Sequence, residues 1–144
     1  MPTIKSKHNK TAYCVDIPGG IKRSNIPAIV YKCHGGPNQK FRHTRKQLRS
    51  TLTKKCLDVN QCNTVVQRKC NPKSKSQKWI RDKKRRFVNA ASRKCLDVEG
   101  GNYKTGKLIA FSCHSGPNQT FIWLFQLQNV FHYHRCISLC RSIL

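Results

Sequence analysis

The sequence predicts an all-β fold in which three repeats of about four short strands each build one common core. A four-residue phrase that begins with Cys and has Asp in third place occurs three times, at intervals of about forty residues. A Gln-x-aromatic phrase follows each copy. The copies of the first phrase are Cys14–Ile17, Cys56–Val59 and Cys95–Val98, and those of the second are Gln39–Phe41, Gln77–Trp79 and Gln119–Phe121.

The segments between these phrases are short apolar runs bounded by Gly, Pro, Asn and basic residues, which favours strands over helices. In the third repeat we expect strands at 86–89, 94–99, 107–111 and 119–123. No long stretch has the 3.6-residue periodicity of a helix bundle. Four strands per repeat would form a closed body without exposed strand edges. We expect the core to contain Phe41, Leu57, Trp79, Leu96 and Phe121.

The length of 144 residues suffices for one compact domain and leaves little room for a second. We expect this domain at residues 1–125, with repeats at about 3–42, 43–81 and 82–125, followed by a tail at 126–144. Four tail residues have spacings that a zinc site could use, but nothing else in the chain supports one. We therefore expect no metal and no cofactor. The four residues are His132, His134, Cys136 and Cys140.

Nine cysteines are too many for an ordinary cytosolic domain and indicate disulfides formed in an oxidising compartment, although metal binding by thiolates stays open. Six of them lie at equivalent points of the three repeats, so three local disulfides are the simplest assignment. The pairs would be Cys14 with Cys33, Cys56 with Cys70, and Cys95 with Cys113. This assignment leaves Cys62, Cys136 and Cys140 over.

The amino-terminal residues contain no apolar run that resembles a signal peptide, and no stretch of eighteen apolar residues predicts a membrane span. This disagrees with the cysteines, which favour a secreted protein or one of the secretory pathway. A missing leader, unconventional export and reduced thiols are three explanations that stay open.

The chain is strongly basic, with 29 Lys and Arg residues, 5 Asp and Glu residues and a formal net charge of +24. Such a charge attracts polyanions, for example sulfated glycans or nucleic acid. The positive charge is densest between Arg68 and Lys94, where Asp82 is the sole acidic residue. This segment is a candidate polyanion site, or simply a solvated surface. The candidate residues are Arg68, Lys83, Lys84, Arg85 and Arg86.

The repeated phrases resemble those of the ricin B-type lectin family over about residues 3–125. Segments 33–39 and 113–119 read Cys-His-Gly-Gly-Pro-Asn-Gln and Cys-His-Ser-Gly-Pro-Asn-Gln, and they are also similar to the lectin domains of polypeptide N-acetylgalactosaminyltransferases. The resemblance implies a β-trefoil with up to three shallow sugar sites. Each site would consist of an Asp, an aromatic residue and an Asn.

The three Asp residues of the repeated phrase are the candidate sugar-binding carboxylates, and we expect them at the surface. A carboxylate can accept two hydrogen bonds from neighbouring sugar hydroxyls, while an aromatic ring covers the apolar sugar face. That each Asp only fixes a turn stays open. We expect galactose or N-acetylgalactosamine sites in the first and third repeats, with glycans or glycoproteins as partners. Their residues are Asp16, Tyr31, Asn38, Asp97, Phe111 and Asn118.

The second repeat departs from this pattern, because Arg68 stands in place of the aromatic residue and Ser76 in place of the Asn. We therefore expect Asp58 to lie in a degenerate site, which could have become an anion site through the guanidinium of Arg68. The Gln residues of the second phrase are expected to be structural. They are Gln39, Gln77 and Gln119.

An enzymatic function is not expected, because no Ser-His-Asp or paired-carboxylate arrangement explains these residues better than the repeats do. The sequence favours a carbohydrate-binding lectin module. The alternatives are a polyanion-binding module and a detached lectin domain of a glycosyltransferase, because this type of fold serves unrelated functions.

Overall fold

The computed structural model describes residues 3–6 and 11–124, which form short strands and single-turn 3₁₀ helices. The strands are β1 (Thr3–Ser6), β2 (Tyr13–Asp16), β3 (Ile26–Pro27), β4 (Ile29–Lys32), β5 (Phe41–Thr44), β6 (Gln47–Ser50), β7 (Cys56–Val59), β8 (Val65–Arg68), β9 (Trp79–Arg81), β10 (Phe87–Asn89), β11 (Cys95–Val98), β12 (Leu108–Phe111) and β13 (Phe121–Leu124). The helices are η1 (Pro18–Gly20), η2 (Pro37–Gln39), η3 (Lys75–Gln77), η4 (Glu99–Gly101) and η5 (Pro117–Gln119).

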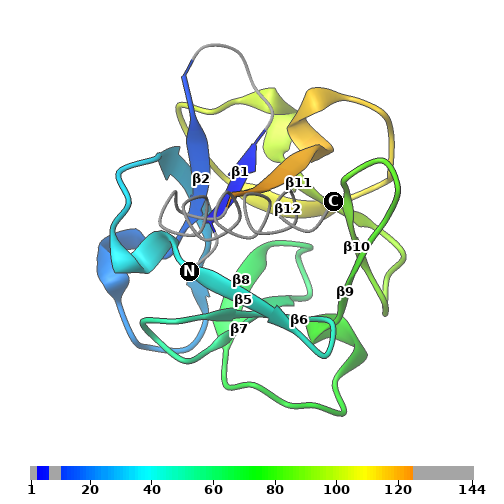
Figure 1. Cartoon of the computed structure of the whole chain (residues 1–144). Coiled ribbons are helices and arrows are strands. Elements are labelled where there is room, and N and C mark those ends of the chain that lie inside the picture. Colours follow the sequence, from blue (N-terminus) through cyan, green and yellow to red (C-terminus); the bar gives the residue numbers. More distant parts are fainter. Residues whose placement is uncertain (1–2, 7–10, 125–144) are drawn as a thin grey trace, which may run out of the picture.

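The strand pairing has an approximate threefold repeat, visible around the centre of Figure 1. In each repeat the second and third main strands form an antiparallel hairpin: β2 with β4, β7 with β8, and β11 with β12. The last strand of one repeat pairs with the first strand of the next, as in β5 with β6 and β9 with β10. The pair β13–β1 closes the ring between the third and first repeats. The all-β prediction with three repeats is therefore confirmed.

The core lies between the three repeats. The strands that pair between repeats contribute alternate side chains to it. In β6, for example, Leu48 and Ser50 are buried while Arg49 is exposed, as the two-residue period of a strand requires. All five predicted core side chains are fully buried. The four expected strands of the third repeat correspond to β10–β13, with ends that differ by at most two residues.

The three predicted disulfides are present and link equivalent points of the three repeats. Each one connects the second strand of its repeat to the segment that follows the third strand. Bridges of this kind typically stabilise a domain by about 2–4 kcal/mol each. Cys62 is a free, exposed thiol, while Cys136 and Cys140 lie outside the described residues.

Several tight turns place basic residues in the left-handed backbone region. Asn and Gly enter this region most readily, whereas other residues are uncommon there. Among the described residues, seven other than glycine have positive φ, and apart from Asn25 and Asn63 all of them are Lys or Arg. These basic residues are Arg45, Lys46, Lys54, Arg85 and Arg93.

Candidate functional site

In the first repeat, Asp16 ends β2 beneath the turn that contains η2. Its Oδ1 accepts a hydrogen bond from Asn38 Nδ2 at 2.9 Å, and its Oδ2 accepts one from Gln39 Nε2 at 2.8 Å. Gln39 is itself fixed, because Nε2 also donates to the Lys32 carbonyl and Oε1 accepts from the backbone amide of His34. The turn after β4 therefore holds the carboxylate of β2 in one orientation.

The third repeat has the same arrangement at Asp97, which lies in β11. Asn118 Nδ2 donates to Asp97 Oδ1 at 3.2 Å, and Gln119 Nε2 donates to Asp97 Oδ2 at 2.7 Å. Gln119 also donates to the Ser112 carbonyl and accepts from the backbone amide of His114. The two sites are thus near copies, built by segments that are far apart in the sequence.

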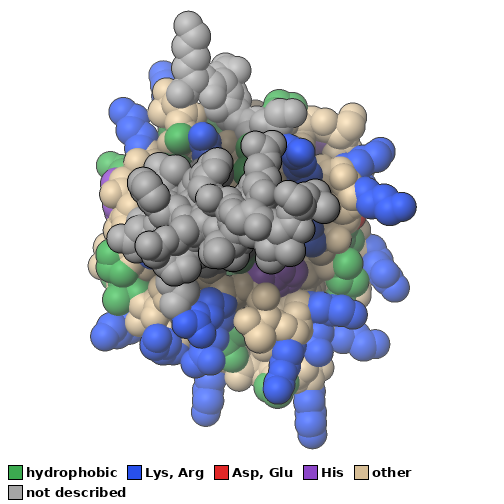
Figure 2. Space-filling view, viewed as in Figure 1, with side chains coloured by type: hydrophobic (Ala, Val, Ile, Leu, Met, Phe, Trp, Pro, Cys, Tyr) green, Lys and Arg blue, Asp and Glu red, His purple; other side chains and the backbone are tan. Residues whose placement is uncertain are grey.

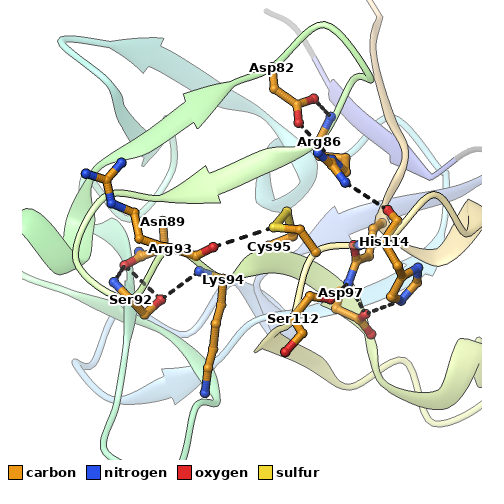
Figure 3. Close-up of a disulfide and its surroundings, with 12 residues drawn as sticks. Asp82, Arg86, Asn89, Ser92, Arg93, Lys94, Cys95, Asp97, Ser112 and His114 are labelled. Atoms are coloured by element: carbon orange, nitrogen blue, oxygen red, sulfur yellow. Dashed lines mark hydrogen bonds and ion pairs between the residues drawn. A yellow bond between two sulfur atoms is a disulfide. The ribbon is translucent and has the colours of Figure 1, made fainter.

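A histidine completes each site. Nε2 of His34 lies 3.5 Å from Asp16 Oδ2, and Nε2 of His114 lies 3.4 Å from Asp97 Oδ2. In the third repeat, Nδ1 of His114 accepts a hydrogen bond from the backbone amide of Gly116 at 2.9 Å. Because Nδ1 is an acceptor, a neutral imidazole must carry its proton on Nε2, the nitrogen that faces the carboxylate. Figure 3 shows His114 beside Asp97.

The turn needs Gly at one position because the histidine and the asparagine leave no room for a side chain. A Cβ on Gly116 would lie 2.8 Å from Nδ1 and Cε1 of His114 and 2.8 Å from Oδ1 of Asn118. The backbone of Gly116 has φ −65°, which any residue can adopt. Space, rather than backbone conformation, therefore requires Gly. Gly36 meets equivalent atoms in the first repeat.

An exposed aromatic ring stands next to each histidine. Tyr31 in β4 is 55% exposed, and Phe111 in β12 is 51% exposed. Their rings meet the imidazoles edge to face, with centroids 6.2 Å apart for Tyr31 and His34 and 6.4 Å apart for Phe111 and His114. Each exposed ring offers an apolar face to a ligand. The structure therefore brings together all six predicted sugar-site residues in two sets of three.

The expected surface position of the carboxylates was wrong. Asp16 is 3% exposed and Asp97 is 2% exposed, so each carboxylate lies on the floor of its site. The amide donors that satisfy the carboxylate also cover it, and a buried charge requires such partners. The predicted structural role of the Gln residues is confirmed, because Gln39, Gln77 and Gln119 are buried and bind the Asp of their repeat.

The second repeat has a different arrangement around Asp58. Arg68 stands where the other two repeats have an exposed aromatic ring. Its Nη1 lies 3.6 Å from Asp58 Oδ2, and its Nε donates to Asn25 Oδ1 at 2.8 Å. Ser76 exchanges a hydrogen bond with Ser74 and makes none to Asp58. Arg68 thus pairs with the carboxylate to which the other repeats bring histidine and asparagine.

Arg86 connects the basic β9–β10 hairpin to the third site. The sequence did not predict this connection. Its Nε donates to Asp82 Oδ2 at 2.7 Å, and its NH1 donates to the carbonyl of His114 at 3.1 Å (Figure 3). Lys83, Lys84 and Arg85 are exposed in the turn between β9 and β10. Of the predicted polyanion residues, Arg68 and Arg86 thus bind protein groups, and the other three face solvent.

His34 and His114 could reach a ligand, but they were not among the predicted site residues, because a turn histidine is usually just solvated. One signal was available: the phrase His-x-Gly-Pro-Asn-Gln occurs in the first and third repeats, whereas Asn71 follows the cysteine in the second. A residue shared only by the two complete repeats is a candidate member of the site.

The third site is expected to lose sugar affinity in acid. Burial raises the pKa of Asp97, against the hydrogen bonds from Gln119, His114 and Asn118, which lower it. Asp97 is therefore protonated at a higher pH than an ordinary Asp, and the neutral acid is a poorer acceptor.

The affinity for sugar should be complete at neutral pH and fall as the pH falls through the raised pKa of Asp97. The pKa of Asp97 is higher in the folded than in the unfolded state. As the pH falls from the folded-state pKa to the unfolded-state pKa, the titration of Asp97 therefore increases the stability of the fold. Calorimetric titration of a Tyr31→Ala variant, which retains only the third site, with thermal unfolding at each pH, measures both effects. If the affinity stays constant down to the pH range in which ordinary carboxyl groups titrate, the expectation is contradicted.

Within the described residues, no group of three or more His, Cys, Asp or Glu side chains is placed to hold a metal ion. The four tail residues considered for zinc lie outside the described residues. None of the described helices has the length and hydropathy needed to cross a lipid bilayer.

Known structures share this fold. The chain resembles the designed threefold-symmetric protein ThreeFoil at 24% identity and a TM-score of 0.76, covering 86% of this chain and 97% of ThreeFoil. It resembles the C-half of the earthworm R-type lectin in complex with GalNAc at 25% identity and a TM-score of 0.73, covering 85% of this chain and 95% of the lectin chain. The structure of GalNAc-T7 with UDP, GalNAc and Mn²⁺ matches at 27% identity and a TM-score of 0.63, covering 78% of this chain and 20% of GalNAc-T7.

No curated protein sequence matches the chain significantly. A family model does match it: the model of the ricin-type beta-trefoil lectin domain covers residues 3–121, which include every strand from β1 to β12 and the first residue of β13. The β-trefoil fold implied by the repeated phrases is therefore confirmed, and the chain belongs to the family of ricin-type β-trefoil lectin domains.

Proposed function

We propose that this protein is a lectin module that binds galactose or N-acetylgalactosamine residues of glycans through the first and third repeats. The observation that carries this proposal is the pairing of an exposed ring with a fixed carboxylate, found in both repeats. Tyr31 packs against His34, which lies beside Asp16, and Phe111 packs against His114, which lies beside Asp97. The earthworm lectin, whose structure contains GalNAc, is 25% identical to this chain and supports the proposal.

The chemistry of each site suits a pyranose. The exposed ring covers the apolar face of the sugar, and the carboxylate on the floor accepts a hydrogen bond from a hydroxyl at the sugar edge. The histidine Nε2–H and the asparagine restrict the directions from which that hydroxyl can approach. A sugar with a different hydroxyl arrangement would leave the buried carboxylate without this partner, which weakens its binding.

The second repeat is proposed not to bind neutral sugar. Arg68 pairs with Asp58 and is also held by Asn25, so a ligand would have to displace a charge-assisted contact. No aromatic ring compensates for that loss.

Removing the rings tests the proposal. We expect Tyr31→Ala or Phe111→Ala each to abolish one of two binding events for N-acetylgalactosamine in calorimetry, because stacking on the ring is lost while the fold is kept. The double variant should show no measurable binding. Ile80→Ala, which truncates another exposed apolar side chain far from both sites, is the matched control. Unchanged binding in the double variant contradicts the proposal.

The three disulfides support a location in the secretory pathway or outside the cell, where such bonds form and persist. A location of this kind agrees with glycans as partners.

A second candidate function is polyanion binding by the turn between β9 and β10. Lys83, Lys84 and Arg85 are exposed there, and the neighbouring Asp82 is bound to Arg86 rather than to these residues. The charges of Lys83, Lys84 and Arg85 are therefore available to an anionic glycan. A Lys83→Gln/Lys84→Gln variant tests this role in the heparin measurement described in the next subsection.

A further inference from the structure

A basic depression lies along the β5–β6 hairpin, and its lining contains no residue of the sites at Asp16 and Asp97. Two adjoining hollows of about 210 and 330 Å³ share Arg42 and Arg49 in their linings. Arg45 and Lys54 complete the basic lining among the described residues, and the rest is Ser, Thr, Gln and Cys. We call this feature the β5–β6 depression.

No Asp or Glu side chain of the chain neutralises the β5–β6 depression. Of the five carboxylates, the three in the repeated phrases are buried and bound to the amides of their own repeats. Asp82 pairs with Arg86, and Glu99 pairs with Lys107. In Figure 2, Lys and Arg side chains are spread over the described surface while Asp and Glu are almost absent from this face.

The strand register places two of the arginines side by side. Arg42 in β5 is the direct partner of Arg49 in β6, and both side chains are exposed. Like charges opposite one another on an antiparallel pair destabilise it. Arg49 Nε donates to the Lys54 carbonyl at 3.1 Å, which orients the guanidinium. Its two terminal nitrogens have no hydrogen-bond partner among the described residues and present a planar pair of donors.

Two more cations occupy backbone positions that disfavour them. Arg45 has φ 51° and Lys54 has φ 62°, where Asn or Gly would be less strained. Four cations therefore meet in the β5–β6 depression, although both the pairing and the turns would be more stable without them.

We propose that the β5–β6 depression binds the sulfate groups of an acidic glycan. The guanidinium of Arg49 supplies parallel donors that match two oxygens of a sulfate group, and Arg45 and Lys54 add charge on either side. The described residues of the lining include no aromatic ring on which a nucleic-acid base could stack, which favours a sulfated glycan over single-stranded nucleic acid. None of the lining residues belongs to the sites at Asp16 and Asp97, so the two kinds of binding are independent.

The test is calorimetric binding of a heparin-derived hexasaccharide at about 0.1 M and 0.3 M salt, because screening separates charge contacts from other contacts. Arg49→Gln and Lys54→Asn should each weaken binding by about three- to tenfold at the lower salt, and together by roughly thirtyfold. The slope of log Kd against log salt should fall by roughly one for each cation removed. Lys54→Asn should unfold at the same temperature or higher, because Asn accepts positive φ more readily.

Arg93→Asn is the matched control. Arg93 occupies the equivalent turn of the third repeat and also has φ 62°. Its carbonyl oxygen lies 3.6 Å from Sγ of Cys113, as that of Lys54 lies 3.5 Å from Sγ of Cys70. We expect Arg93→Asn to change hexasaccharide binding less than about twofold, because it changes only the screened overall field. N-acetylgalactosamine binding, measured in parallel, should stay unchanged in all of these variants.

Three results would overturn the proposal. Arg93→Asn and Lys54→Asn could weaken hexasaccharide binding equally, which would show that this binding depends on net charge alone. Arg49→Gln/Lys54→Asn could bind the hexasaccharide as the original chain does, with Lys83→Gln/Lys84→Gln weakened instead, which would place binding on the other hairpin. A single-stranded oligonucleotide of equal charge could bind as tightly and respond equally to Arg49→Gln, which would identify a nucleic-acid site.

Discussion

Replacing Asp16 and Asp97 together by Ala is expected to abolish binding of galactose-type sugars and also to destabilise the domain. Each substitution removes the charged acceptor of a sugar hydroxyl from its own site, and the loss of one such hydrogen bond, about 1.5–3 kcal/mol, should weaken binding at that site by roughly 10- to 100-fold. Each also leaves one N–H of the buried Gln39 or Gln119 amide without an acceptor, while the other still donates to a backbone carbonyl. A buried donor without a partner costs about 1–3 kcal/mol, so the melting temperature should fall as well.

Asp58→Ala separates these two effects. Asp58 is as buried as the other two and accepts a hydrogen bond from Gln77, but its site lacks the ring and the asparagine. This variant should therefore lose comparable stability and keep full sugar affinity. Calorimetric titration and thermal unfolding of the three single variants measure both quantities. If Asp16→Ala and Asp97→Ala lower stability but leave affinity intact, the carboxylates serve only to fix their turns.

The repeats made the fold predictable, because each phrase combines a strand, a disulfide cysteine and a core residue at a fixed spacing. The burial of Asp16 was not predictable from the same phrase. Simple alternation along β2 would bury every second residue, but Cys14, Val15 and Asp16 are all buried. Val15 lies in the core, Cys14 carries the disulfide, and Asp16 is bound by Gln39 from a later turn. The burial of three consecutive residues thus depends on partners from distant segments.

The second repeat illustrates the same limit. The sequence indicated that Arg68 replaces a ring, and this suggested an exposed guanidinium. In the structure, Arg68 is held by Asp58 of the adjacent strand and by Asn25 of the first repeat. Asn25 lies far away in the sequence, in a turn with positive φ, and no local pattern connects it to Arg68. The strands and cysteines within each repeat can be predicted from the sequence, whereas contacts between repeats can be identified only from the three-dimensional structure.

Gly116→Ala is expected to disable the third site while leaving the fold intact. The backbone at Gly116 suits Ala, but the new Cβ would lie 2.8 Å from the ring of His114 and from Oδ1 of Asn118. Both side chains point at Asp97, so the displacement that relieves the overlap takes them away from the carboxylate. His114 is exposed and can move outward. The overlap should therefore be relieved at the site rather than in the core.

We expect the affinity of the third site for N-acetylgalactosamine to fall by about 10- to 100-fold, because a misplaced polar partner weakens a hydrogen-bonded site by about 1–3 kcal/mol. Calorimetry in a Tyr31→Ala background isolates that site, and Ser115→Ala, a truncation at the exposed neighbouring residue, is the control. In a double-mutant cycle with His114→Ala, Gly116→Ala should have a smaller effect, since the ring that it displaces is already absent and only the overlap with Asn118 remains. Full affinity in Gly116→Ala, or equal effects with and without His114, would show that the crowded turn does not position the histidine.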